Sequence, residues 1–148
     1  MSAAHIHLLL NHIPILGSIF GVLLLLYATL KKSDEIKRVC FGVFVIAALM
    51  TIPVYLTGDG AARIVRDLPD VSRDIIREHD NAATFAIISS ELLGAVSLLA
   101  WWLTRNGKRL ATWMLIVVIV LAVWSSSVVM RTGQLGGQVR HSEVRALP

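Results

Sequence analysis

Residues 5–30 read HIHLLLNHIPILGSIFGVLLLLYATL, and no charged residue occurs before Lys31. A helix needs about 20 predominantly apolar residues to cross the hydrocarbon core of a bilayer. This run is long enough, whether the helix starts near residue 5 or near residue 11. Three histidines, His5, His7 and His12, stand at its beginning. The stretch therefore predicts a membrane-spanning helix with histidines gathered at one end.

Three further apolar runs have the same character and cover residues 39–57, 82–104 and 110–130. Hydrophobic residues make up 55% of the chain, charged residues make up 16%, and the mean hydropathy is +0.69. A soluble domain is about 25% charged. We therefore predict an all-α integral membrane protein, a four-helix up-and-down bundle that forms a single domain over residues 1–148.

The links between the runs differ in charge. Links 31–38 and 105–109 are short and dense in Lys and Arg, whereas link 58–81 holds four arginines against six acids. Short loops that are dense in Lys and Arg stay in the cytoplasm. We expect both termini and link 58–81 on the outer, periplasmic side of a bacterial inner membrane. Lys and Arg total seven on each side, so this orientation rests on their density in short loops.

The net charge of +4 does not indicate a nucleic-acid partner. Basic residues bracket the apolar runs, as membrane topology requires, and form no patch interleaved with aromatic residues. The lipid bilayer is the expected surrounding instead. The single cysteine, Cys40, excludes an intramolecular disulfide and a site built from several cysteines.

Residues 61–78 form an amphipathic pattern that Pro69 interrupts. Apolar residues recur there between charges at helical spacing: Ile64, Val65, Leu68, Val71, Ile75 and Ile76. The pattern predicts a short helical segment on the outer membrane surface, between the second and third spans. A docking surface for a soluble partner is the alternative.

Pro14 shapes the backbone beside the histidines, because it has no N–H to donate to the carbonyl of Leu10. If the helix starts at Asn11, Pro14 lies in the first turn and Asn11 is a candidate N-cap. If it starts at His5, a kink at the histidines is expected.

The predicted topology brings His79 and His141 to the same end of the bundle as the first three histidines. The first and third spans of an up-and-down bundle are diagonal neighbours. We therefore predict that His12 and His79 face one another and bind the two sides of a haem b iron. Arg131 and Arg140 flank a glycine-rich tail that could fold back over the bundle mouth, where both would pair with haem propionates.

The other histidines leave a second interpretation open. His5 and His12 are seven residues apart and share a helix face, whereas His7 lies about 140° away. A copper or zinc site is the main alternative to haem. Its predicted ligands are His7, His12, His79, His141 and Glu78, with Asp80 and Glu143 nearby. Histidines that cap the bundle through hydrogen bonds alone are the third possibility.

Glu91 is the only acid inside a predicted span. Such a carboxylate is costly in a membrane and faces the bundle interior as a rule. We expect it to be protonated or to share its proton with a serine or threonine. The candidates for this partner are Thr51, Ser125, Ser126 and Ser127.

Three motifs together resemble a family: HIHLLLNHIPILG at 5–17, REHD at 77–80 and RTGQLGGQVRH at 131–141. They are similar to an uncharacterised bacterial family of small four-helix membrane proteins, which is compared with the two-haem b-type cytochromes. The resemblance covers nearly the whole chain. It implies that the family's polar positions fall on His7, His12, His79 and His141, with Glu78. Two-haem cytochromes place ligands toward both membrane faces, whereas these candidates lie toward one, so at most one haem is expected.

These features together predict a small membrane electron-transfer protein or subunit that holds a b-type haem near the outer face. It would pass electrons between the quinone pool and an outer-side partner, alongside other subunits of a respiratory assembly. A non-catalytic accessory subunit of a membrane complex is one alternative. A copper- or zinc-binding membrane protein is the other.

Overall fold

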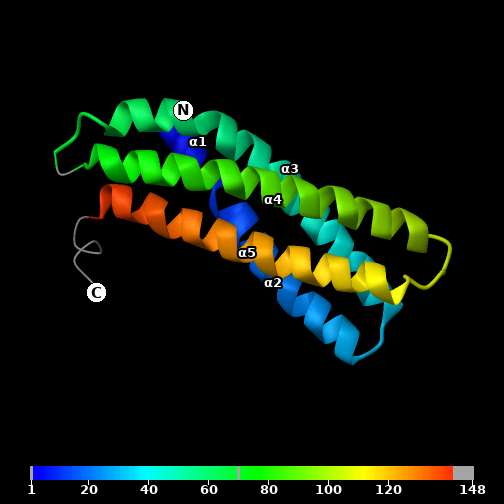
Figure 1. Ribbon diagram of the computed structural model, residues 1–148. Helices are drawn as coiled ribbons and strands as arrows, with labels where there is room; N and C mark the ends of the chain where they lie inside the picture. Colours follow the sequence, from blue (N-terminus) through cyan, green and yellow to red (C-terminus); the bar gives the residue numbers. More distant parts are fainter. Residues whose placement is uncertain (1, 70, 142–148) are drawn as a thin grey trace.

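The computed structural model describes residues 2–69 and 71–141, and this part of the chain holds five α-helices (Figure 1). They are α1 (Ala3–Leu10), α2 (His12–Leu30), α3 (Asp34–Val65), α4 (Arg73–Thr104) and α5 (Thr112–Arg140). The first two form one interrupted span, so four segments in the described chain are long and apolar enough to cross a membrane. The predicted all-α four-helix membrane bundle is confirmed.

The helices form a closed ring of neighbours. α2 packs against α3 and α5, α4 packs against the same two helices, and α1 lies along α3. α2 and α4 are therefore diagonal to one another. The α2–α3 and α4–α5 loops lie together at what we call the basic end. α1, the α3–α4 loop and the end of α5 lie at the opposite, histidine end (Figure 1).

Local hydrogen bonds fix the basic end. The Ser33 side chain accepts from the N–H of Ile36 at 3.3 Å and caps α3. Asp34 follows in the first turn, where a negative charge interacts favourably with the helix dipole. The Arg38 guanidinium donates to the carbonyl of Thr104 at 3.0 Å and thereby ties α3 to the end of α4.

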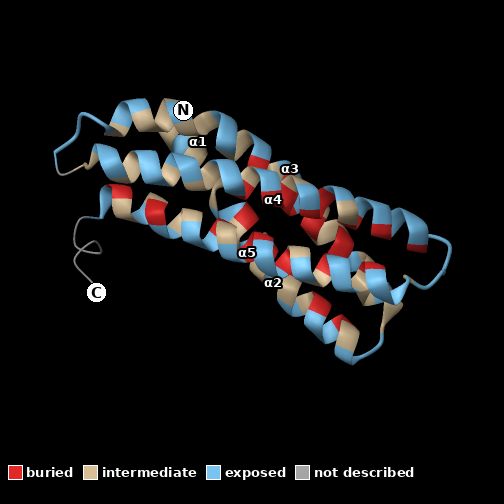
Figure 2. Ribbon diagram, in the orientation of Figure 1, coloured by how far each residue is buried: buried red, intermediate tan, exposed pale blue. Residues whose placement is uncertain are grey.

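The hydrophobic core occupies the middle and the basic end of the bundle (Figure 2). Its largest fully buried side chains include Phe41, Phe44 and Val118. Helices approach closely there, since a Cβ on Gly94 of α4 would stand 2.5 Å from the Cβ of Ala48 in α3. At the histidine end, α1 has no buried residue. The bundle is therefore tightly packed toward the basic end and less filled at the histidine end.

Three helices are longer than the sequence pattern predicts. α3 continues to Val65 and α4 begins at Arg73, so residues 61–78 form no separate surface helix. They extend the two spans instead, and the break falls at 66–72, around Pro69. α5 likewise continues through its glycines to Arg140, and does not fold back over the bundle mouth. Glycine costs a helix about 1 kcal/mol without preventing its hydrogen bonds, and packing against neighbours offsets this cost.

Of the two helix starts considered for the first span, the structure has the early start, with a kink beside the histidines. α1 begins at Ala3, and the helix is interrupted at Asn11, whose side chain makes no capping hydrogen bond. Pro14 leaves the carbonyl of Leu10 without its usual helical partner. The break lets α1 lie along α3 while α2 crosses the bundle (Figure 1).

Candidate functional site

His7 and His79 lie against one another at the histidine end. Their ring centroids are 6.4 Å apart and the ring planes are nearly perpendicular, at 87°. His7 comes from α1 and His79 from the second turn of α4, so the pair joins the first span to its diagonal neighbour. The structure thus places His7, and not His12, beside His79.

A backbone carbonyl holds each of the two rings. Nδ1 of His7 is 2.9 Å from the carbonyl oxygen of Val54 in α3, and Nδ1 of His79 is 3.0 Å from that of Thr132 in α5. A carbonyl oxygen can only accept, so the hydrogen must sit on Nδ1 in both rings. With Nδ1 protonated, the neutral form of each ring has its lone pair on Nε2. Both imidazoles are therefore in the tautomer that can bind a metal through Nε2.

The pair lines a cavity of about 710 Å³ that all five described helices help to enclose. Its wall is mostly apolar. Polar residues in the wall include Asn11, His12, Thr51, Tyr55, Asp80, Thr132, Arg140 and His141. The Asn11 side-chain oxygen is enclosed and has no hydrogen-bond partner in the described chain. An apolar chamber with a few convergent polar groups is the usual form of a small-molecule site.

Gly136 lets α5 approach the site closely. A Cβ at Gly136 would stand 3.0 Å from Cε1 of His79, whereas one at Gly137 would meet nothing within 4 Å. On the opposite side, a Cβ at Gly58 would lie 3.9 Å from Cε1 of His7. Gly136 and Gly58 are both helical and leave room for the two rings.

The remaining histidines lie outside the pair. His12 is exposed, and its Nδ1 is 3.2 Å from the carbonyl of Leu8, although it also lines the cavity. His5 is exposed, and its Nδ1 is 2.8 Å from the Ser2 hydroxyl. His141 is exposed and lines the cavity just beyond α5. His12 and His141 therefore share the cavity wall with the pair, while His5 stands near the exposed start of α1.

Arg131 and Arg140, the two arginines predicted to pair with haem propionates, lie in different surroundings. Arg140 lines the cavity, but Arg131 faces Glu78, with 3.7 Å between Nη2 and Oε1. No three His, Cys, Asp or Glu side chains of the described chain gather closely enough to hold a metal ion. Glu143 lies outside the described residues. The structure thus brings together a pair of histidines rather than the larger predicted set.

Glu91 is half-buried in α4, and its Oε1 is enclosed without a hydrogen-bond partner among the described residues. Ser125 instead meets Ser90 at 3.3 Å, and the Thr51 hydroxyl donates to the carbonyl of Ala47 at 3.0 Å. Ser127 donates to Val123 at 2.8 Å. Proton sharing between Glu91 and these serines and threonines therefore has no support in the described contacts.

No family model, curated protein or solved structure matches the chain. The candidate site consequently rests on its own geometry.

Proposed function

We propose that the protein is a small membrane electron-transfer protein whose His7 and His79 hold one b-type haem. The site would lie near the outer face of a bacterial inner membrane, where the protein exchanges electrons with the quinone pool, alone or within a respiratory assembly. The observation that carries the proposal is the His7–His79 pair.

The separation of the two ring centroids is close to that of two imidazoles on one metal ion, and the present T-shaped contact would open for both Nε2 atoms to face the iron. Metal–imidazole bonds are about 2 Å long, so two rings on opposite sides of one metal ion have centroids roughly 6 Å apart. The observed separation is 6.4 Å. The surrounding cavity, at about 710 Å³, also falls within the range of small-molecule sites, about 300–1,000 Å³.

The hydrogen bonds of the rings support the same assignment. The carbonyls of Val54 and Thr132 fix the tautomer and the orientation of His7 and His79, as partners of metal-binding histidines usually do. Arg140, in the cavity wall, is available to pair with a propionate. A bound haem would supply one-electron chemistry, and two histidine ligands leave no open position for oxygen.

Absorption spectra of the purified full-length protein, supplied with haem during expression, test the proposal. We expect a Soret band and sharp reduced α and β bands, which mark low-spin iron. His7→Ala and His79→Ala should each remove the low-spin spectrum. His12→Ala and His5→Ala are the matched controls and should retain it.

Other outcomes would point elsewhere. Loss of the spectrum in His12→Ala but not in His7→Ala would contradict the proposed pair. A featureless spectrum with stoichiometric copper or zinc would indicate a metal-binding protein. A featureless spectrum without bound metal would leave the accessory-subunit role.

A further inference from the structure

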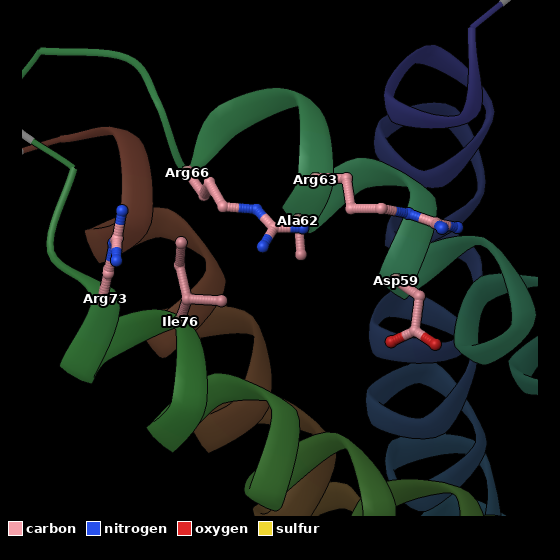
Figure 3. A pocket seen from close by; sticks show the side chains of 6 residues that line it. All are labelled: Asp59, Ala62, Arg63, Arg66, Arg73 and Ile76. Carbon is pink, nitrogen blue, oxygen red and sulfur yellow. The ribbon is translucent and has the colours of Figure 1, made fainter.

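A second pocket lies between the end of α3 and the start of α4. Its volume is about 450 Å³, and it is lined by Asp59, Ala62, Arg63, Arg66, Arg73 and Ile76. Figure 3 shows Arg66, which follows α3, and Arg73, the first residue of α4, on opposite sides of the pocket, with the Arg63 guanidinium directed toward α1 and away from Arg73. We propose that Arg66 and Arg73 bind a phosphate-bearing anion.

The lining of this pocket holds three arginines and one acid, Asp59, so the charge of the lining is positive. Arg63, Arg66 and Arg73 form no ion pair with another described residue. The acid in the first turn of α4, Asp74, pairs instead with Arg77 at 3.0 Å. An anion entering the pocket would therefore meet guanidinium groups that no carboxylate of the described chain already occupies.

Arg73 argues most strongly for a bound anion. It is the first residue of α4, where the helix dipole is positive and a cation is unfavourable. The side chain of the N-cap residue Ser72 makes no capping hydrogen bond. Favourable interaction with the C-terminal carbonyls of α3 explains Arg63 and Arg66, but it does not explain Arg73. Helix N-termini and paired guanidinium groups are both recurrent phosphate-binding devices.

A lipid headgroup and a free phosphate could both supply this chemistry. Ala62 and Ile76 give the pocket an apolar wall, and Ile64 and Leu68 nearby are 49% and 40% exposed. An anionic lipid would place its phosphate at the arginines and direct its chains toward the membrane-spanning parts of α3 and α4. Inorganic phosphate would use the arginines alone. Membrane proteins do bind lipid headgroups in basic pockets between helices.

Native mass spectrometry of the full chain in detergent, with equal phosphatidylglycerol and phosphatidylcholine, tests the site. The wild type should retain phosphatidylglycerol preferentially. In Arg66→Gln/Arg73→Gln, loss of charge-assisted hydrogen bonds should weaken its binding about tenfold or more. Arg105→Gln is the matched control, because Arg105 lies at the basic end, outside the pocket, and forms no ion pair within the described chain. It should bind like the wild type.

A titration with inorganic phosphate shows whether the bound anion is a lipid headgroup or a soluble phosphate. Displacement of phosphatidylglycerol by phosphate supports the site with a lipid as its ligand. Arginine-dependent binding of phosphate, without preference for phosphatidylglycerol, supports it with a soluble ligand. Binding of either probe that persists in the double variant, or falls equally in Arg105→Gln, overturns the proposal, as does the absence of binding by both probes.

Circular dichroism must first show that the double variant keeps its helical content. If it does not, the single variant Arg73→Gln takes its place, with the same expected loss of binding. Salt provides a check on the unmodified chain, since binding of the anion should weaken as sodium chloride rises.

Discussion

At the scale of single residues, Gly136 and Gly137 are adjacent in α5 but differ in what a methyl group would meet. Gly137→Ala should stabilise the helix by about 0.5–1 kcal/mol, because alanine loses less conformational entropy than glycine and its Cβ has open space. In Gly136→Ala the Cβ would press on the His79 ring at 3.0 Å. Such overpacking costs about 1–3 kcal/mol.

We therefore expect Gly136→Ala to be less stable than Gly137→Ala in denaturant unfolding in detergent, followed by circular dichroism. Equal stability of the two variants would mean that the His79 ring yields without cost. Displacement of the ring should also weaken its hydrogen bond to Thr132.

The residue scale also shows what sequence could and could not predict of the site. His7 and His12 both line the cavity, although the helix is interrupted between them at Asn11. Helical spacing predicts only that two residues about 140° apart do not share one face of a continuous helix. It does not say which face turns inward. That choice depends on the break at Asn11 and on the packing of α1 along α3, which are tertiary features. The role of Gly136 was hidden for the same reason, since its neighbour His79 comes from another helix.

At the scale of helices, the close contact between α3 and α4 leaves no room for a side chain on Gly94. Gly94→Ala would bring Cβ to 2.5 Å from the Cβ of Ala48, so the two backbones must separate. We expect a loss of about 1–3 kcal/mol in unfolding free energy. Gly42→Ala, in α3, meets nothing within 4 Å and is the control. A Gly94→Ala variant as stable as the control would show that the helices part freely.

The number and order of the spans follow from apolar runs, but their ends do not. Residues 58–65 contain two glycines and two charged residues, which are typical of a loop. They remain helical in α3 because α1 packs on them, and a Cβ on Gly60 would stand 2.6 Å from the Cβ of Ala3. Apolar periodicity cannot reveal a helix that continues beyond the hydrocarbon and is held by a neighbour.

At the scale of the whole molecule, the dense basic loops predict that the basic end faces the cytoplasm. In a Cys40→Ala background, Asp67→Cys should react with a membrane-impermeant maleimide in intact cells. Lys32→Cys should react only after lysis. The reverse pattern would place the cavity, and both proposed sites, on the cytoplasmic side.

The lengths of α3 and α4 have a consequence for how the protein responds to its lipids. Each has 32 residues and is about 48 Å long, some 18 Å more than a typical hydrocarbon core of roughly 30 Å. Exposed Trp101, Trp102 and Trp113 anchor the basic end at the interface, so this surplus falls at the other end. Lipids with longer chains would rise around His7 and His79 and lower the local dielectric constant, whereas shorter chains would leave the rings beside water. The thickness of the membrane would thereby change the polarity of the surroundings of His7 and His79 without any change in the protein.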